Sequence, residues 1–274
     1  MPCACARCMR VLTIFAILLA AMSLNAAVVQ PLGAGFQLLI PAAGSTPGVG
    51  GTFFRSDISI LNLSGHDQVV QLQWLPQAGL SLPQPVLLTL KTATGIRSAD
   101  FVHDYMNQTG LGAILVTAAL NPDGTGIDQT GRLFVSSRIW TPQPGTNGTT
   151  SQDLPAIPAS QLNTPAAAIF SMGGADDPQS YRTNVGIVNL DPAHAQTFSI
   201  IHFIQDPPGP IVITIPPFSM QQVSLGTIVP GEQIQIQNIT QTNRSNFWTA
   251  YGSTINNVTG DAWDELAVVG TTTP

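Results

Sequence analysis

The chain contains an internal duplication. Residues 53–63 read FFRSDISILNL, and residues 180–190 read SYRTNVGIVNL. A constant offset of 127 positions keeps an aromatic residue, an arginine, a hydroxyl residue, an Asp or Asn, aliphatic residues and an asparagine in register. Each copy must bury the same apolar positions, so a duplication of this kind indicates one fold built twice. The sequence therefore predicts two equivalent units in one chain.

Both copies continue with segments that have strand character. Residues 68–75 (QVVQLQWL) alternate polar and apolar side chains, and residues 197–204 (TFSIIHFI) occupy the same place in the second copy. Alternation with a period of two turns one face of a strand toward a core. Several short segments of this kind, punctuated by 22 prolines and 25 glycines, favour an all-β fold of two sandwiches over one large barrel.

The remaining segments predict connections between these strands. We expect residues 41–51 to form a flexible loop, and residues 98–105 and 221–229 to form short connections, the first with Ser98 capping a helical turn. Residues 155–165 contain three prolines and no periodicity, which marks the boundary between units as a short linker or a last edge strand.

The N-terminal segment has the pattern of an export signal. Arg7 and Arg10 precede an uncharged apolar run over residues 11–24, and small residues follow at Ala26 and Ala27. That run is shorter than the roughly 20 residues needed to span a bilayer. We therefore expect cleavage of a signal peptide over residues 1–27 and no stable membrane span afterwards; the alternative is an uncleaved N-terminal anchor. The predicted domains are then residues 28–160 and residues 161–274.

The charge and cysteine content exclude several classes of protein. All three cysteines, Cys3, Cys5 and Cys8, lie in the leader, so the exported chain has no disulfide and no cysteine metal site. Loss of Arg7 and Arg10 would change the net charge from −6 to −8. A negative chain without a basic patch is not expected to bind nucleic acid.

At these same segments the chain resembles uncharacterised secreted bacterial proteins with tandem immunoglobulin-like β-sandwich domains. The resemblance rests on residues 40–57, 137–140, 181–189 and 251–261, which frame nearly the whole exported chain. It implies an exported, secreted or cell-surface protein with two immunoglobulin-like sandwiches. It implies no activity and no catalytic or ligand residues, and fold alone does not determine function.

Two pairs of residues are candidates for specific roles. Arg55 and Arg182 match across the duplication although arginine is scarce. They predict either a repeated ligand clamp or, as we favour, an arginine that ties a strand to a loop in each copy. Trp140 and Trp263 lie near turns, where an aromatic face can contact a sugar, and are the candidate ligand contacts.

No cofactor or metal site is expected from the sequence. The four histidines do not show the spacing of a metal motif, and no nucleophile elbow or phosphate-binding glycine loop occurs. Residues 121–128 (NPDGTGID) place two carboxylates and an amide in a glycine-rich loop. Calcium binding there is the alternative to a hairpin loop, which we favour because calcium needs six to eight oxygens.

The functional hypotheses follow from these features. The first is a non-enzymatic, secreted or cell-surface module with a structural or adhesive role, whose partner would be an extracellular glycan or a surface protein. The second is a carbohydrate-binding protein that uses Trp140 or Trp263. The third is a secreted hydrolase with two carboxylates brought together by the fold. Ligand and oligomeric state are left open by the sequence.

Overall fold

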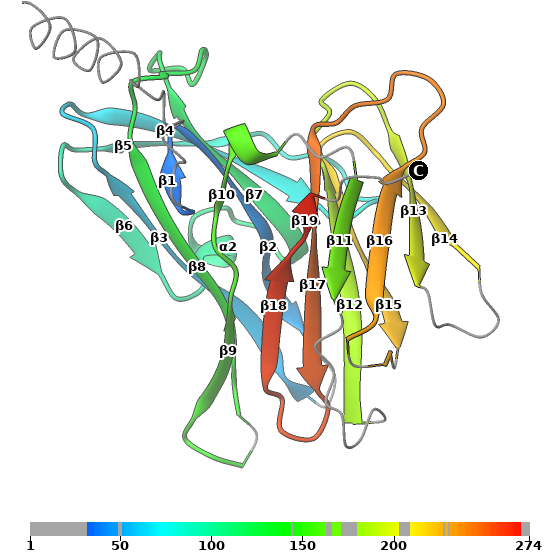
Figure 1. The fold of residues 1–274 in the computed structure, drawn as a ribbon. Helices are drawn as coiled ribbons and strands as arrows, with labels where there is room; N and C mark the ends of the chain where they lie inside the picture. The colour runs from blue at the N-terminus through cyan, green and yellow to red at the C-terminus, as the bar shows by residue number, and fades with distance from the viewer. Residues whose placement is uncertain are drawn as a thin grey trace, which may run out of the picture. The chain divides into compact units, whose positions relative to one another are not determined.

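The chain folds as antiparallel β-sheets in the computed structural model, which describes residues 32–48, 51–143, 145–162, 166–170, 180–202, 209–226, 228–229 and 231–269 (Figure 1). The expected leader lies outside the described residues. The expected all-β class is confirmed, with three sheets and short helical turns at α2 and η2. Among the described residues, no helix is long and apolar enough to cross a membrane.

The strands before residue 160, which we call the first repeat, form one sheet with the order β1-β8-β3-β2-β7-β4-β5. The three short strands β6, β9 and β10 pair with β3, β8 and β2. The elements are β1 (Ala34–Gly35), β2 (Gln37–Pro47), β3 (Phe53–Asn62), β4 (Gln68–Pro76), β5 (Val86–Leu90), β6 (Gly95–Ser98), α2 (Phe101–Asp104), β7 (Gly110–Ala119), β8 (Leu133–Pro142), β9 (Thr149–Asp153) and β10 (Ile157–Pro158).

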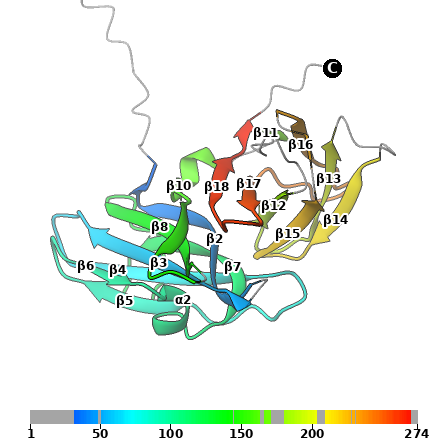
Figure 2. The same ribbon diagram turned by 90° about the horizontal axis from the view of Figure 1, so that it is seen from below.

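The strands after residue 160, which we call the second repeat, form two sheets. One has the order β14-β13-β16-β11-β19, and in the other β12 lies between β15 and β17 with β18 at the edge (Figure 1, Figure 2). The elements are η2 (Ala159–Gln161), β11 (Ala166–Phe170), β12 (Tyr181–Asn189), β13 (Gln196–His202), β14 (Ile211–Ile215), β15 (Ser219–Gly226), β16 (Gln233–Asn238), β17 (Trp248–Asn256), β18 (Ala262–Leu266) and β19 (Val268–Val269).

The two repeats have the same pairing order. In the first repeat, β5-β4-β7-β2-β10 and β6-β3-β8-β9 run in the order of the two second-repeat sheets. They count as one sheet because β2 also pairs with β3 through three residue pairs at their ends. Arg55 lies opposite Trp140, and Arg182 lies opposite Ile255. The two arginines therefore occupy equivalent positions, as their sequence register predicts.

A buried asparagine stabilises the same corner of each repeat. The side-chain amide of Asn62 donates to the carbonyls of His66, Leu90 and Lys91 at 2.9, 3.1 and 3.2 Å. Its carbonyl oxygen accepts from the backbone N–H of Ser64 at 2.8 Å. Both Asn62 and its counterpart Asn189 are fully buried, and each places all of its side-chain polar atoms in hydrogen bonds to the backbone.

Asn189 repeats this arrangement in the second repeat. Its amide donates to the carbonyls of His194, Ile215 and Pro216 at 3.0, 3.1 and 2.9 Å, and its oxygen accepts from the N–H of Asp191 at 3.0 Å. In both copies the amide ties the end of one strand to a turn and to the end of the next-but-one strand. The matched asparagines of the sequence thus have a structural explanation.

Each repeat has its own hydrophobic core between its two layers. In the first repeat, Ile58 and Ile60 from β3 meet Leu72 from β4 and Ile114 from β7. In the second repeat, Val185 and Ile187 from β12 join Phe198, Ile234 and Trp248. As expected from alternation, the inward positions of the matched strands are aliphatic.

A third core joins the repeats, and we call it the junction core. It gathers the other faces of β2 and β7 from the first repeat and of β12 and β17 from the second. Its buried members are Leu39, Ala42, Leu75, Ala113, Leu115, Ile139, Leu154, Ile157, Leu162, Val188, Leu190, Met220 and Tyr251. Residues Pro31–Pro274 accordingly form a single compact unit.

Two expected connections are strands. Residues 41–47 belong to β2 and not to a flexible loop, since their small side chains allow close strand pairing: a Cβ at Gly44 would lie 3.0 Å from the carbonyl of Gly110. The register of β2 shifts between Ile40 and Ala43, where Pro41 cannot donate to the ladder. Residues 221–226 belong to β15, which pairs with β12 over almost its whole length.

The structure also differs from the sequence-based expectation at the helical turn and at the segment between the repeats, but the differences there are smaller. Helix α2 begins at Phe101, with Asp100 as its N-cap residue and not Ser98. The boundary segment is packed, because Ile157 pairs with β2 and Leu162 is fully buried. Residues 163–165 lie outside the described part, and the division into domains at residue 160 stays a prediction.

The buried asparagines give a stability test. We expect Asn62→Ala and Asn189→Ala each to lower the free energy of unfolding by about 2–4 kcal/mol, because a fully buried side chain and its four hydrogen bonds to the backbone are lost. Chemical denaturation measures the effect. The control is Asn246→Ala, which changes an exposed asparagine and should alter stability by less than about 0.5 kcal/mol. Equal effects at all three positions would contradict this role.

Candidate functional site

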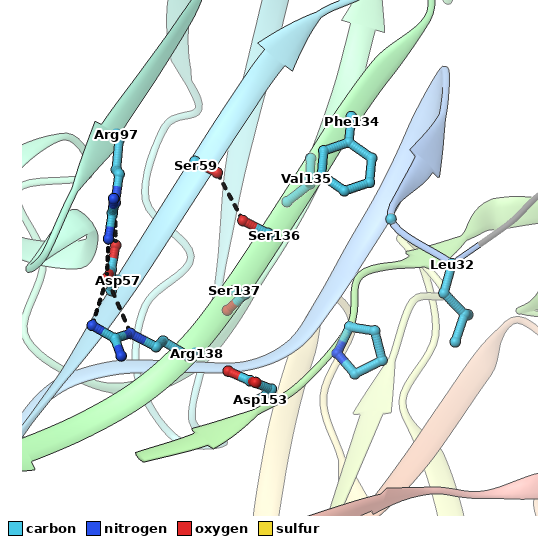
Figure 3. A pocket seen from close by; sticks show the side chains of 12 residues that line it. Leu32, Asp57, Ser59, Arg97, Phe134, Val135, Ser136, Ser137, Arg138 and Asp153 are labelled. Carbon is cyan, nitrogen blue, oxygen red and sulfur yellow. Dashed lines mark hydrogen bonds and ion pairs between the residues drawn. The ribbon is translucent and has the colours of Figure 1, made fainter. Parts of the chain in front are cut away.

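A cavity with both charged and apolar walls lies on the outer face of the first repeat (Figure 3). Its volume is about 600 Å³. The residues that line it come from β3, β6, β8 and the segments around β1 and β9: Leu32, Gly33, Asp57, Ser59, Arg97, Phe134, Val135, Ser136, Ser137, Arg138, Asp153 and Pro155.

Strand alternation explains why these side chains meet. Asp57 and Ser59 lie on the face of β3 opposite to Ile58 and Ile60, which are in the core. On the neighbouring β8, Arg138 is directly opposite Asp57, and Ser136 is opposite Ser59. The hydroxyls of Ser59 and Ser136 are 2.7 Å apart. Residues 81 and 77 positions apart in sequence are thus cross-strand neighbours.

Asp57 is held by two arginines. The Arg97 guanidinium donates through Nε to Oδ1 at 2.9 Å and through Nη2 to Oδ2 at 2.8 Å. Arg138 donates through Nε to Oδ2 at 3.1 Å. The Asp57 side chain is 6% exposed, against 68% for Arg97 and 42% for Arg138. The hydrogen bonds from Arg97 lower the pKa of Asp57, and those from Arg138 add to the effect against the opposing effect of burial.

This arrangement suits binding better than proton transfer. With its pKa lowered, Asp57 stays ionised at neutral pH and is a poor general acid. The outward faces of Arg97 and Arg138 offer N–H donors, and the Ser59–Ser136 pair offers hydroxyls. Phe134, 37% exposed, adds an apolar surface at the far end (Figure 3). The cavity can therefore receive a polar ligand that has one apolar side.

Arg55 and Trp140 form a separate group on the same sheet face. The Nε of Arg55 lies 3.3 Å from Oδ2 of Asp100, and its guanidinium lies over the rings of Phe53 and Trp140, at 4.7 and 5.5 Å from the centroids. The indole N–H of Trp140 donates to the carbonyl of Ala99 at 2.7 Å. Trp140 is half-buried, and its indole N–H is already used in the hydrogen bond to Ala99.

Arg182 and Trp263 lie in the second repeat. Arg182 donates through Nη1 to Oδ1 of Asn257. Trp263, half-buried on β18, makes an edge contact with the Tyr181 ring at 5.7 Å between centroids. The structure does not bring Trp140 and Trp263 into one cavity, since neither lines any of the three described cavities. A sugar contact at either tryptophan stays a prediction.

The loop over residues 121–128 folds back on itself, with Ala119 bridging Ile127 in antiparallel fashion, but it is not the expected hairpin loop between two paired strands. It joins β7 to β8, and these strands do not pair with each other because they belong to opposite layers. Asp123 accepts from the N–H and hydroxyl of Thr125, and Asp128 accepts from Thr130 and from His66 at 3.0 Å. No group of three or more metal-binding side chains occurs in the described ranges. Calcium binding at this loop remains open.

Sequence reasoning missed the Asp57 cavity. Arg97 and Arg138 lie 40 and 81 residues from Asp57, and no spacing rule links such distant positions. Strand alternation was the signal that could have found it. It places Asp57 on the outward face of its strand, and it places the polar residues of 133–140 on the outward face of theirs. Pairing those two segments would have placed Arg138 beside Asp57.

Comparisons with known proteins do not assign the chain to a family. No known family matches the chain, and no curated protein matches it. Among solved structures, it is similar to a partial N-terminal region of an enterococcal surface protein, with 7% identity and a TM-score of 0.19 over 90% of this chain and 97% of that one. This likeness is too low to support an argument about fold or function.

The ion pairs of Asp57 predict a pH-dependent stability. A lowered pKa in the folded state means that their contribution is present above about pH 4 and is lost as the pH falls further. We expect Asp57→Asn to lower the free energy of unfolding by about 1–3 kcal/mol at pH 7 and by much less at pH 3. Denaturation at the two pH values measures this; an equal loss at both would contradict it.

A buried carboxyl occurs beside the junction core. Asp264 on β18 is opposite Ser253 in the strand register, and β18 packs against β9 of the first repeat. Neither carboxylate oxygen has a hydrogen-bond partner in the described structure. Burial raises the pKa of Asp264 to about 7, and the charge of Asp153 adds to the increase. The hydroxyl of Ser253 lowers the pKa of Asp264 by more than the charge of Asp153 raises it, but burial outweighs both. The same hydroxyl donates to the side-chain oxygen of Gln152 at 3.3 Å.

The raised pKa of Asp264 predicts the opposite pH dependence. The folded state holds this proton more tightly than the unfolded chain, so stability falls as the pH rises from about 4 to above 7. We expect Asp264→Asn to remove that fall and to stabilise the protein at pH 8 by up to roughly 4 kcal/mol, with little change at pH 4. Thermal unfolding across this range tests it, and parallel curves for the two proteins would contradict it.

Proposed function

We propose that this protein is an exported, non-enzymatic module of the cell surface or its surroundings, with a structural or adhesive role. In this proposal, residues 1–27 are a cleaved signal peptide, and residues 28–160 and 161–274 are two tandem immunoglobulin-like sandwiches. The identical pairing order of the two repeats supports two domains of one kind. The apolar run and small residues of the leader support export.

The observation that carries the proposal is the distribution of apolar and polar sheet faces. The faces that meet between the repeats are apolar and form the junction core. The free outer face of the first repeat carries Asp57, Arg97 and Arg138, and that of β16 carries alternate glutamines, Gln233, Gln235 and Gln237, around the buried Ile234 and Ile236. Polar end faces are what terminal units of a repeat array need for solubility.

These features describe a two-unit spacer with a stable joint. A joint made of buried aliphatic side chains holds neighbouring domains more firmly than a polar linker does. Asp57, which two arginines keep ionised, supports ligand contact and not acid–base chemistry in the cavity. The hydrolase hypothesis therefore ranks below a binding or structural role.

Glycan binding is the second candidate function, and the Asp57 cavity favours it. The cavity combines charged hydrogen-bonding groups fixed on a sheet with the hydroxyls of Ser59 and Ser136 and the apolar Phe134. Saccharides present hydroxyl groups along one edge and C–H groups on the ring face, so both kinds of wall have a partner. In this candidate the Asp57 cavity is the contact site, in place of the two tryptophans.

Export and the leader are tested together. We expect the full chain, expressed with its own N-terminus in a bacterial host, to leave the cytoplasm, and its first residue to be Ala27 or Val28. Cell fractionation and N-terminal sequencing measure both. The control lacks residues 11–24 and should stay in the cytoplasm. Cytoplasmic retention of the full chain would contradict the proposal, and an intact N-terminus on membranes would support the anchor.

The two roles are separated by binding. We expect the purified exported chain to bind intact bacterial envelopes in a sedimentation assay. If the second candidate is right, a neutral glycan array gives signals that Arg97→Ala reduces at least tenfold, whereas Arg244→Ala, at an exposed arginine of the second repeat, leaves them unchanged. Envelope binding without any array signal favours a protein partner, and the absence of both contradicts an adhesive role.

A further inference from the structure

Two cavities meet at Arg182, where the repeats adjoin. Their volumes are about 330 and 360 Å³, and Phe54, Arg182 and Ile255 line both of them. Phe54 comes from the first repeat, and the other two come from neighbouring strands of the second. Arg182, on β12, is thus a wall shared by two cavities between the repeats, and neither cavity shares a lining residue with the Asp57 cavity.

The charge of Arg182 is not compensated. In the described parts of the chain, its side chain donates to the neutral amide of Asn257, and no carboxylate lies within ion-pair distance. Its counterpart Arg55, by contrast, has Asp100 at 3.3 Å. Burial lowers the pKa of Arg182, which shows that the guanidinium is partly removed from water. A half-buried charge without a counter-charge is only partly solvated, and an anionic ligand would offset that loss of solvation.

The remaining walls are neutral. Arg182 is the one charged side chain that lines either cavity in the described structure. Asn184, Gln222 and Ser253 line the larger cavity, and strand register makes them the counterparts of Asp57, Arg97 and Arg138 in the first repeat. The charged group of the first repeat is thus replaced here by amides and a hydroxyl, which leaves Arg182 without competition for an anion.

The ligand class follows from this lining. A guanidinium with unused N–H groups matches the two oxygens of a carboxylate in a planar, bidentate geometry. A single arginine on a chain of net charge −6 is poorly suited to phosphate dianions or polyanions, which need several positive groups. The neutral hydroxyls and amides, such as Thr150 and Asn256, match sugar hydroxyls, and Phe54 matches a ring face.

We propose that the space around Arg182 is a binding site for a carboxylate-bearing saccharide, that is, a uronic acid residue of a glycan. The carboxylate pairs with the Arg182 guanidinium, and the sugar hydroxyls bind the neutral side chains on both repeats. This site is independent of the Asp57 cavity and of the proposed role of the whole protein. It gives the joint between the repeats a function of its own.

The test compares two ligands that differ in one group. Methyl β-D-glucuronide carries a carboxylate at C6, and methyl β-D-glucoside carries a hydroxymethyl group there. We expect isothermal titration of the exported chain to show binding of the glucuronide that is at least about tenfold tighter than that of the glucoside. Acetate is the third ligand, and it should bind at least tenfold more weakly than the glucuronide because it lacks the sugar.

Variants locate the site. Arg182→Gln should weaken glucuronide binding at least tenfold, whereas Arg244→Gln, at an exposed arginine away from both cavities, should leave it unchanged. Arg182→Lys keeps the charge but loses the bidentate geometry, so a smaller loss is expected. It also keeps the proposal testable if Arg182→Gln fails to fold, which thermal unfolding would reveal.

Several results would overturn the proposal. These are equal binding of glucuronide and glucoside, equal binding of acetate and glucuronide, or glucuronide binding that survives Arg182→Gln. Absence of glucuronide binding to the wild-type chain at about 10 mM ligand, which would detect a dissociation constant of roughly 1 mM, would overturn it as well. Failure of export or envelope binding would leave these results unaffected, so the two proposals fail separately.

Discussion

Alternate side chains of single strands enter two different hydrophobic cores, and the rest of the structure depends on this constraint. Leu38 and Ile40 of β2 point into the core of the first repeat, and Leu39 points into the junction core. On β17, Trp248 and Tyr251 divide in the same way between the second core and the junction core. A shift of one residue would exchange the two sets, so these registers are specified from both faces at once.

Equivalent positions in the two repeats carry different side chains because their outer faces have different neighbours. Ser59 and Ser136 share a hydroxyl contact on the free face of the first repeat. Their counterparts, by strand register, are Gly186 and Tyr251, and a Cβ at Gly186 would collide with the Tyr251 ring. Where the first repeat has a pair of hydroxyls, the second repeat thus has a large aromatic ring in close contact with a glycine. The duplication accounts for the shared backbone arrangement of the two repeats. The different neighbours of each outer face account for the different side chains at equivalent positions.

The features predictable from sequence were those that depend on local pattern and on repetition. Alternation located most strands, and the constant offset put Arg55 and Arg182 at equivalent places. Two kinds of feature were not predicted from the sequence. Residues 41–47 look like a loop because Pro, Gly and Ser dominate them, yet close packing on β7 requires small side chains there. The junction core was not visible because a strand buried on both faces has no polar period to reveal it.

The matched arginines show why repetition predicts position better than role. Both were expected to tie a strand to a loop. Arg55 has the partners for that: Asp100 precedes α2, and the Trp140 indole below the guanidinium binds Ala99 of the same segment. The corresponding part of the second repeat is strand β15, which supplies no carboxylate to Arg182 in the described structure. One arginine is therefore neutralised within its own repeat, and the other has no carboxylate partner among the described residues.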